Sequence, residues 1–235
     1  MSKKLFFISV LFLFTCINSV AQHVNEDSIA IEFILQESIF NSKSENNKFI
    51  FTGRSVALET FKFYVSEVFF SYKGKTTFIE ENSYHLIDFE YKNTLSFWLT
   101  PSKEIQYDHI HFNLGIDSLT NVSGALDGDL DPTKGMYWTW QSGYINLKME
   151  GKLLPSYPIN HNFEFHLGGY LPPYQSFQKI KLRCEPSDNI IIKVNPSTFF
   201  DRINFKSQNN VMSPGKEALK LSILASQLFT IDEKK

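Results

Sequence analysis

The sequence predicts an all-β protein: a single-domain antiparallel β-sandwich with one C-terminal α-helix packed on it. Three observations support this prediction. Short stretches rich in β-branched and aromatic residues recur at intervals of about ten residues, with turn residues between most of them. The aromatic content is high, with 23 Phe, 10 Tyr and 3 Trp in 235 residues, and such rings fill β-sheet cores well. Only the last segment of the chain has a helical period.

The first strand is predicted over residues 28–35, because apolar residues there alternate on one face: Ile29, Ile31, Phe33 and Leu35. Residues 61–70 predict a second strand from their β-branched and aromatic content. Polar residues 41–47 predict a loop, and residues 72–75 predict a turn. Further strands are predicted over residues 84–89, 94–99, 107–114, 144–150, 163–167, 178–183 and 190–194.

The C-terminal helix is predicted to begin near Ser213, which can cap it, and Pro214, which suits the first helical position. Five apolar residues then share one helical face: Ala218, Leu221, Ala225, Leu228 and Phe229. The sequence shows no repeat and no linker, so one domain is expected.

The N-terminus predicts a secretory signal peptide over residues 1–21, followed by a mature domain over residues 22–235. Lys3 and Lys4 precede an uncharged run over residues 5–14, and small residues lead to a cleavage site after Ala21. We therefore expect export to the periplasm or outside the cell, without stable membrane insertion. The alternatives are an uncleaved membrane anchor or lipidation at Cys16. Cleavage would leave Cys184 alone, which we expect to be a buried thiol.

Charge and motifs exclude several classes of function. The formal net charge is −2, and a nucleic-acid-binding domain needs a basic surface, so no nucleic-acid partner is expected. The sequence has no phosphate-binding loop, dinucleotide fingerprint or nucleophile elbow. We expect a protein that is not an enzyme.

Two histidines could share a metal ion. His109 and His111 lie two positions apart on a predicted strand, so their imidazoles would project from the same face. Copper and zinc both accept imidazole ligands. The alternative is that one histidine is a core residue and the other lies at a sheet edge.

Alternating carboxylates at Asp127, Asp129 and Asp131 are similar to the start of a calcium-binding loop. However, Pro132 occupies the place of the usual turn glycine, and no glutamate follows at the twelfth position. An Asx-rich turn is the preferred interpretation, with a weak calcium site as the alternative.

The segment over residues 135–144, GMYWTWQSGY, contains two of the three tryptophans, Trp138 and Trp140. If the segment is extended, both rings lie on one face. They either form an aromatic layer of the core or belong to a site, and composition does not choose between the two.

Several motifs together resemble the MbnP family. They are GMYWTWQSGYINLKMEG over residues 135–151, FNLGIDS and LDGDLDP over 112–132, FEFHLGG over 163–169, and FKFYVSEV with YHLIDFE over 61–90. The resemblance covers most of the mature chain, and the combination of W-x-W-x-x-G-Y with H-L-G is its most specific part.

This resemblance implies a secreted β-rich copper-binding protein that carries or buffers Cu(I). It also implies a partner, a di-haem MauG-like peroxidase, that oxidises one tryptophan to kynurenine. Carried over by motif, Trp138 or Trp140 is the modified residue and His166 is an imidazole ligand; His109, His111 or His85 could supply others. An indole offers only an N–H donor, whereas kynurenine has an amine and a ketone that can bind a metal.

The chain departs from the four-cysteine branch of this family at two places. No cysteine lies near the H-L-G motif, where Gly168, Gly169 and Tyr170 stand, and Val122 follows Asn121 where that branch has a histidine. The alternative function is therefore a metal-free secreted β-sandwich that binds a ligand or a partner protein, with Trp138 and Trp140 in its core.

Overall fold

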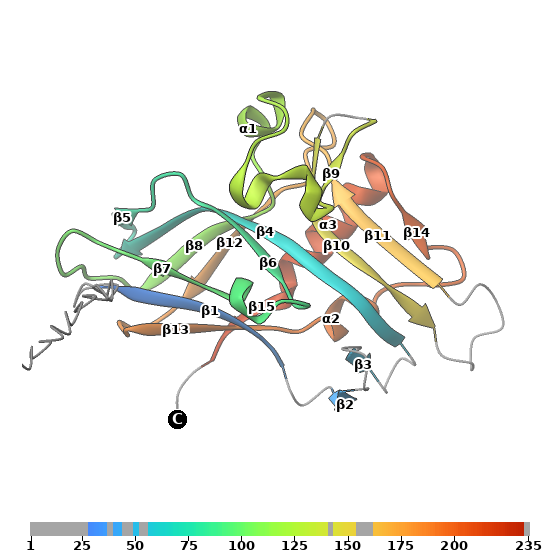
Figure 1. Ribbon diagram of the computed structural model, residues 1–235. Coiled ribbons are helices and arrows are strands. Elements are labelled where there is room, and N and C mark those ends of the chain that lie inside the picture. The colour runs from blue at the N-terminus through green and yellow to red at the C-terminus, as the bar shows by residue number, and fades with distance from the viewer. Residues whose placement is uncertain are drawn as a thin grey trace, which may run out of the picture.

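A computed structural model describes residues 28–36, 40–43, 49–51, 56–140, 143–153 and 162–232 (Figure 1). The predicted signal peptide and its cleavage site lie outside these residues. The fold is mostly β, with two sheets, one of them a curled half-barrel, and a C-terminal helix. No helix in the described part of the chain is long and apolar enough to cross a membrane.

The smaller sheet has the strand order β15-β13-β1-β7. These strands are β15 (Phe229–Ile231), β13 (Asn189–Val194), β1 (Ile29–Leu35) and β7 (Ser96–Leu99). β1 pairs antiparallel with β7 but parallel with β13. The prediction of a purely antiparallel architecture is wrong here, because alternation along one strand does not reveal the direction of its partner.

The larger sheet is built around the long strand β4 (Val56–Tyr72). One edge of β4 pairs first with β10 (Gly143–Leu153) and then with β8 (His109–Leu114). Three strands pair with its other edge: β3 (Phe49–Phe51), β6 (Tyr84–Asp88) and β5 (Lys75–Ile79). The remaining strands are β2 (Phe40–Lys43), β9 (Tyr137–Trp138), β11 (Asn162–Gly168), β12 (Gln178–Arg183) and β14 (Asn210–Val211).

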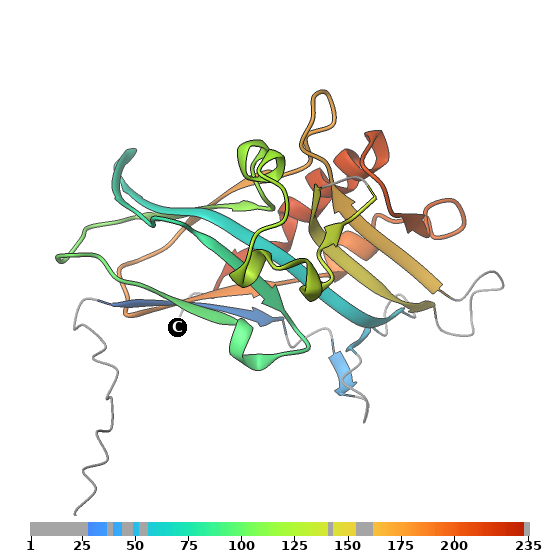
Figure 2. The same cartoon turned by 45° about the horizontal axis from the view of Figure 1, so that its top comes forward.

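The larger sheet forks where β10 gives way to β8 along β4. Asn146 fills the fork: its side chain accepts a hydrogen bond from the backbone N–H of Ile116 at 3.0 Å and donates one to Ser176 Oγ at 2.9 Å. A Cβ on Gly115 would lie 2.3 Å from the Asn146 side chain, so only glycine fits opposite it. The fork splits the sheet into a β10–β11 half and a β8–β12 half (Figure 2).

The main core lies between the two sheets and is strongly aromatic. Phe33 of β1 meets Phe63 of β4 edge to face at 5.6 Å and Phe112 of β8 at 6.0 Å. All three rings are buried. Cys184, directly after β12, is also buried, and this burial raises the pKa of its thiol to about 12. The predictions of an aromatic core and of a buried thiol are confirmed.

The C-terminal helix α3 (Lys216–Ala225) packs against β11. It begins later than predicted, with Gly215 in place of Ser213 at the N-cap position. It also ends earlier, because Leu228 lies in a 3-10 turn and Phe229 starts β15. Leu228 and Phe229 are buried all the same, so their apolar pattern reports burial and not helix length.

Most predicted strands are confirmed within a few residues, but short elements were missed. β2 occupies part of the predicted loop over 41–47. The missed strands are β3, β5, β9, β14 and β15, and the missed helices are α1 (Ser118–Val122) and α2 (Ser197–Phe200). These elements have two to five residues, too few to show a period, and β5 (Lys75–Ile79) is also mostly exposed, so it lacks the apolar alternation of a half-buried strand.

Candidate functional site

The segment over residues 116–140 covers the outer face of the larger sheet over β6, β4 and the start of β10, and its Trp138 reaches the end of β11. This segment contains α1, the 3-10 turns Gly128–Leu130 and Pro132–Lys134, and β9 (Figure 1). It encloses a second apolar cluster made by Tyr64, Leu86, Ile116, Leu130, Met136, Trp138, Tyr144 and Ile145. The segment therefore buries a part of the outer sheet face that would otherwise be exposed to solvent.

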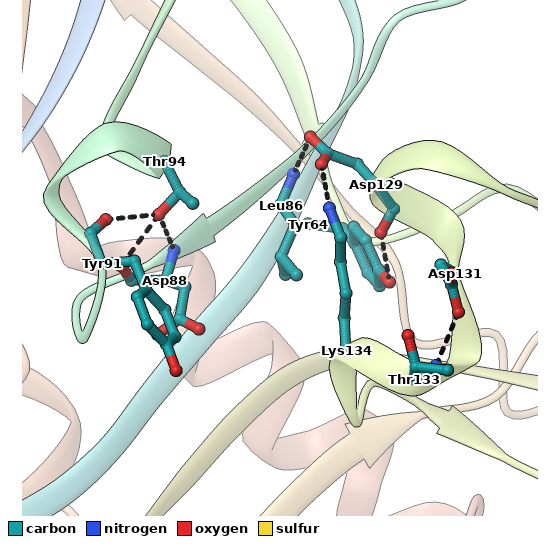
Figure 3. Close-up of polar contacts among 9 residues, drawn as sticks. All are labelled: Tyr64, Leu86, Asp88, Tyr91, Thr94, Asp129, Asp131, Thr133 and Lys134. Atoms are coloured by element: carbon teal, nitrogen blue, oxygen red, sulfur yellow. Dashed lines mark hydrogen bonds and ion pairs between the residues drawn. The ribbon is translucent and has the colours of Figure 1, made fainter.

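The aspartates of this segment attach it to the sheet (Figure 3). Asp129 Oδ2 accepts a hydrogen bond from the backbone N–H of Leu86 on β6 at 2.9 Å, and Asp129 Oδ1 pairs with Lys134 Nζ at 2.5 Å. Tyr64 donates its hydroxyl to the Asp129 carbonyl at 3.0 Å. Asp131 accepts from the backbone N–H of Thr133 at 2.8 Å.

These contacts support the Asx-turn interpretation over a calcium site. Asp131 makes the short local hydrogen bond that defines such a turn, and both Asp129 oxygens already have protein partners. Asp127 makes no side-chain hydrogen bond at the start of its 3-10 turn. Within the described ranges, no three His, Cys, Asp or Glu side chains are grouped so that they could hold a metal ion.

Trp138 lies on β11. It belongs to β9, which pairs with the start of β10, and its side chain is 5% exposed. A Cβ on Gly168 would lie 2.7 Å from the Trp138 ring, so the indole occupies the space that a side chain at position 168 would need. Residues 166 and 168 face the same side of the strand. Trp138 therefore lies over the face of β11 that also carries His166.

Trp140 is at the surface. Its side chain is 65% exposed, and its ring centroid is 5.9 Å from that of Trp138. The two tryptophans thus form a pair with one buried and one exposed member. This result does not fit the core interpretation, which required both rings to be buried.

His166 is almost fully buried and is bound to a carboxylate. Its Nε2 lies 2.6 Å from Oε1 of Glu150 on β10, and Lys148 Nζ lies 3.3 Å from the same oxygen. The hydrogen bond from His166, followed by the charge of Lys148, lowers the pKa of Glu150 to about 2. A carboxylate on one ring nitrogen fixes the imidazole and leaves the other nitrogen, Nδ1, for a further ligand.

His109 and His111 lie in the other half of the sheet. His111 is opposite Phe69 on β4, whereas His166 is opposite Lys148, which in turn is opposite Lys62. Phe69 and Lys62 are seven positions apart along β4, so the two histidines are separated by roughly 20 Å along the strand direction. The structure therefore does not bring His111 or His109 to His166, although all three were predicted as possible ligands of one metal.

The imidazoles of His109 and His111 do project from the same face, with ring centroids 6.2 Å apart. His109 Nδ1 contacts Asp108 at 2.7 Å, and His111 Nε2 contacts Ser71 Oγ at 2.8 Å. Burial, followed by the charge of Lys181, lowers the pKa of His111. The two side chains opposite them on β12 are cationic, Lys181 and Arg183, and these charges oppose the binding of a cation.

Three further positions bear on the expected ligands: Asn121, Val122 and His85. Asn121 is buried; it accepts a hydrogen bond from the backbone N–H of Tyr144 and donates to the carbonyls of Ile116 and Asp117. Val122, where a histidine stands in the four-cysteine branch, is 62% exposed. His85 stacks on Phe97 and contacts Glu80.

Two residues of this site, Glu150 and Gly168, were not predicted from the sequence. Glu150 had a weak signal, because Lys148 and Glu150 alternate with apolar residues on a predicted strand and must share its outer face. Gly168 had none, because the indole that fills its side-chain space comes from a distant segment.

Comparison with known proteins gives one family and one fold match. The sequence model of the MbnP family matches residues 24–213. Among solved structures, the chain is similar to MbnP from Methylosinus trichosporium, with a TM-score of 0.52 and 14% sequence identity. The match covers 79% of this chain and 82% of that one. No curated protein matches the chain.

Proposed function

Because the chain belongs to the MbnP family, we propose that it is an exported protein that binds Cu(I) and acts as a copper carrier or buffer. The observation that supports this proposal is the shared face of β11, where the Trp138 ring lies over Gly168, two positions along the strand from His166. The proposal assigns binding, not catalysis, to the site.

His166 fits the role of an imidazole ligand. Glu150 holds Nε2 at 2.6 Å, and a carboxylate in this position selects the tautomer whose Nδ1 is free to bind a metal. Burial of the ring limits competition from water. One imidazole alone is too few ligands, and no second histidine lies near His166 in the described residues.

The second ligand in this proposal comes from a tryptophan. An unmodified indole is only an N–H donor, so the site needs the ring-opened kynurenine, whose amine and ketone can bind copper. Trp138 is the better candidate because it lies over Gly168, whereas Trp140 is exposed to solvent. The oxidation would be performed by a partner, a di-haem MauG-like peroxidase, with hydrogen peroxide as the oxidant. Two equivalents of peroxide add two oxygen atoms across the indole C2–C3 bond and leave as water, and hydrolysis then releases C2 as formate. The peroxidase could reach Trp140 at the surface of the monomer and Trp138 through it.

Metal analysis and peptide mass spectrometry of the exported protein test this function. The protein should be expressed as the full chain together with the peroxidase. We expect one copper per chain and the mass of kynurenine on the peptide that contains Trp138. Trp138→Phe and His166→Ala should each lose most of the copper.

His111→Ala is the matched control, because it removes an imidazole from the other half of the sheet and should keep the copper. Unmodified tryptophans together with copper-free protein would refute the proposal. Copper that survives His166→Ala but is lost in His111→Ala would move the site to β8.

The alternative function is a metal-free module that binds a ligand or a protein. It is favoured by the hydrogen bond to Glu150 that already occupies His166 Nε2 and by the exposure of Trp140. It predicts normal folding and partner binding in His166→Gln, without any effect of copper chelators.

A further inference from the structure

Four segments that are distant in the sequence meet at one end of the molecule. They are residues 118–126, 136–140, 169–177 and 209–215, and this end contains α1 and the start of α3 (Figures 1 and 2). Ser118 Oγ donates to the Tyr170 carbonyl at 2.7 Å, and Gln175 donates to Ser118 Oγ at 2.9 Å. We call this surface the uncharged end.

The other two segments are joined to this surface by direct packing. A Cβ on Gly169 would meet the Tyr174 carbonyl at 2.9 Å and the Pro214 side chain at 3.0 Å. Trp140 lines an open depression of about 620 Å³ together with Met212 and Pro214. The four segments therefore form one continuous surface.

Exposed apolar side chains gather on this surface. Of the eleven large apolar residues that are exposed in the described part of the chain, seven belong to it: Leu119, Val122, Leu126, Trp140, Leu171, Tyr174 and Met212. Leu119 is the most exposed of all, at 76%. Isolated surface apolar residues are common, but a contiguous group marks an interaction surface.

The same surface is free of formal charge. None of the four segments contains Asp, Glu, Lys or Arg, although these residues make up 20% of the chain. Charged residues border it: Asp117 and the exposed Asp127 flank the segment 118–126, and Lys216 and Glu217 line the depression from the first turn of α3. The core of a protein–protein interface is depleted of charge in this way.

We propose that the uncharged end is a self-complementary contact between two copies of this chain. A two-fold contact brings the same patch of both copies together, so a patch of one charge sign would face like charge there. A patch without charged residues meets its own copy without that repulsion. The four segments together also supply the roughly 20–30 residues per partner that a standard interface uses.

A lipid surface fits this end less well. Proteins that lie on anionic membranes surround their apolar residues with Lys and Arg, and the four segments contain neither. A second copy presents the same apolar, uncharged chemistry and pairs with it around a two-fold axis.

Sedimentation equilibrium of the full chain, purified after export, tests the proposal. We expect a reversible dimer with a dissociation constant between about 1 and 100 µM. Because the face is uncharged, the constant should change less than about threefold between low and high salt. Leu119→Glu with Leu171→Glu should weaken the dimer at least about tenfold through charge burial at the contact.

Ile79→Glu is the matched control, because Ile79 is 65% exposed on β5, in the other half of the sheet. This variant should leave the dimer unchanged. A monomer at every concentration would overturn the proposal, and so would a dimer that Ile79→Glu weakens and the double variant does not. Copper retention by Leu119→Glu/Leu171→Glu is measured in parallel, so the outcome is separate from that for the copper site.

Discussion

The two halves of the larger sheet treat the same kind of outer face in different ways. On the side of β10, the segment over 116–140 covers the sheet from β6 to the end of β11 and buries Tyr64, Trp138 and Tyr144. In the β8–β12 half, the outer face stays open, and His109 and His111 are only partly buried beside Lys181 and Arg183. Both halves pair with the same strand, β4.

The difference shows that the segment packed over a sheet face, and not the alternation along the strand, decides whether an outward side chain is buried or exposed. His166 and His111 both project from the outer face of a strand. Under the cover, His166 is 6% exposed and its carboxylate partner has a strongly lowered pKa. On the open face, the His111 ring stacks on Phe69 with their centroids 4.2 Å apart. It contacts the Ser71 hydroxyl, and Lys181 lies opposite it on β12.

The largest expected effect comes from removing the space into which Trp138 fits. In Gly168→Ala, the new Cβ would lie 2.6 Å from the Tyr144 carbonyl and 2.7 Å from the Trp138 ring. Backbone on one side prevents relaxation, so we expect a loss of about 3 kcal/mol in the free energy of unfolding. Urea denaturation measures this loss.

The double variant Gly168→Ala/Trp138→Leu identifies the cause. It should be less destabilised than the sum of its two single variants, because the smaller side chain removes one of the two clashes. If the losses in unfolding free energy of the two single variants add up in the double variant, Trp138 does not clash with a side chain at position 168.

The next effect tests the fork that separates the two halves. Asn146→Ala removes the hydrogen-bond acceptor of the buried Ile116 N–H, and it also removes the Asn146 amide that donates to Ser176 Oγ. We expect a loss of about 2 kcal/mol in unfolding free energy. Ser176→Ala keeps the Ile116 bond and loses those from Ser176 Oγ to Asn146 and to the Gly169 carbonyl, which still accepts from the Ser176 backbone N–H. It should cost about half as much, because no backbone group is left without a partner. An Asn146→Ala variant no less stable than Ser176→Ala would contradict this role of Asn146.

The stability of the protein as a function of pH tests the contact between Glu150 and His166 in the covered half. The pKa of Glu150 is lowered from 4.5 to about 2, so its ionised form stabilises the fold above pH 4.5, and this stabilisation is lost as the pH falls from 4.5 to 2. We expect Glu150→Gln to be less stable than the natural protein by about 1 kcal/mol at pH 7, after allowance for solvent screening. The difference should vanish near pH 2.

Glu164→Gln serves as the control for Glu150→Gln. Glu164 lies directly opposite Glu150 on β11. Both substitutions remove one carboxylate, so they change the net charge by the same amount. A pH-independent difference for Glu150→Gln, or an equal one for Glu164→Gln, would show that the His166 contact is not responsible.

The smallest effect belongs to the open half. His111→Gln should change the unfolding free energy at pH 7 by about 0.5 kcal/mol, the scale of one cross-strand contact. The pKa of His111 is lowered, so the natural protein loses stability as the pH falls below 6.5, and the variant should lack this part of the loss. Thermal unfolding at pH 7 and pH 5 compares the two proteins. A larger loss at pH 7 than for Glu150→Gln would reverse the ranking of the two halves.

Part of the candidate site follows from the sequence and part does not. The motifs WTW and HLG are enough to single out Trp138, Trp140 and His166. The sequence does not say that Trp138 is buried and Trp140 exposed, because the two lie two positions apart in a pattern that fits either outcome. Nor does it separate His111 from His166, since pairing between strands is set by contacts far apart in the chain.

The sequence by itself determined the β-rich class, most strand positions, the C-terminal helix and the aromatic core, because alternation and composition are local properties of the chain. Only the tertiary structure decided which outer face is covered, where the sheet forks and which carboxylate meets His166. These depend on the pairing of β4 with both β10 and β8 and on a segment folding back over one half. Such long-range contacts leave no periodic mark on either partner.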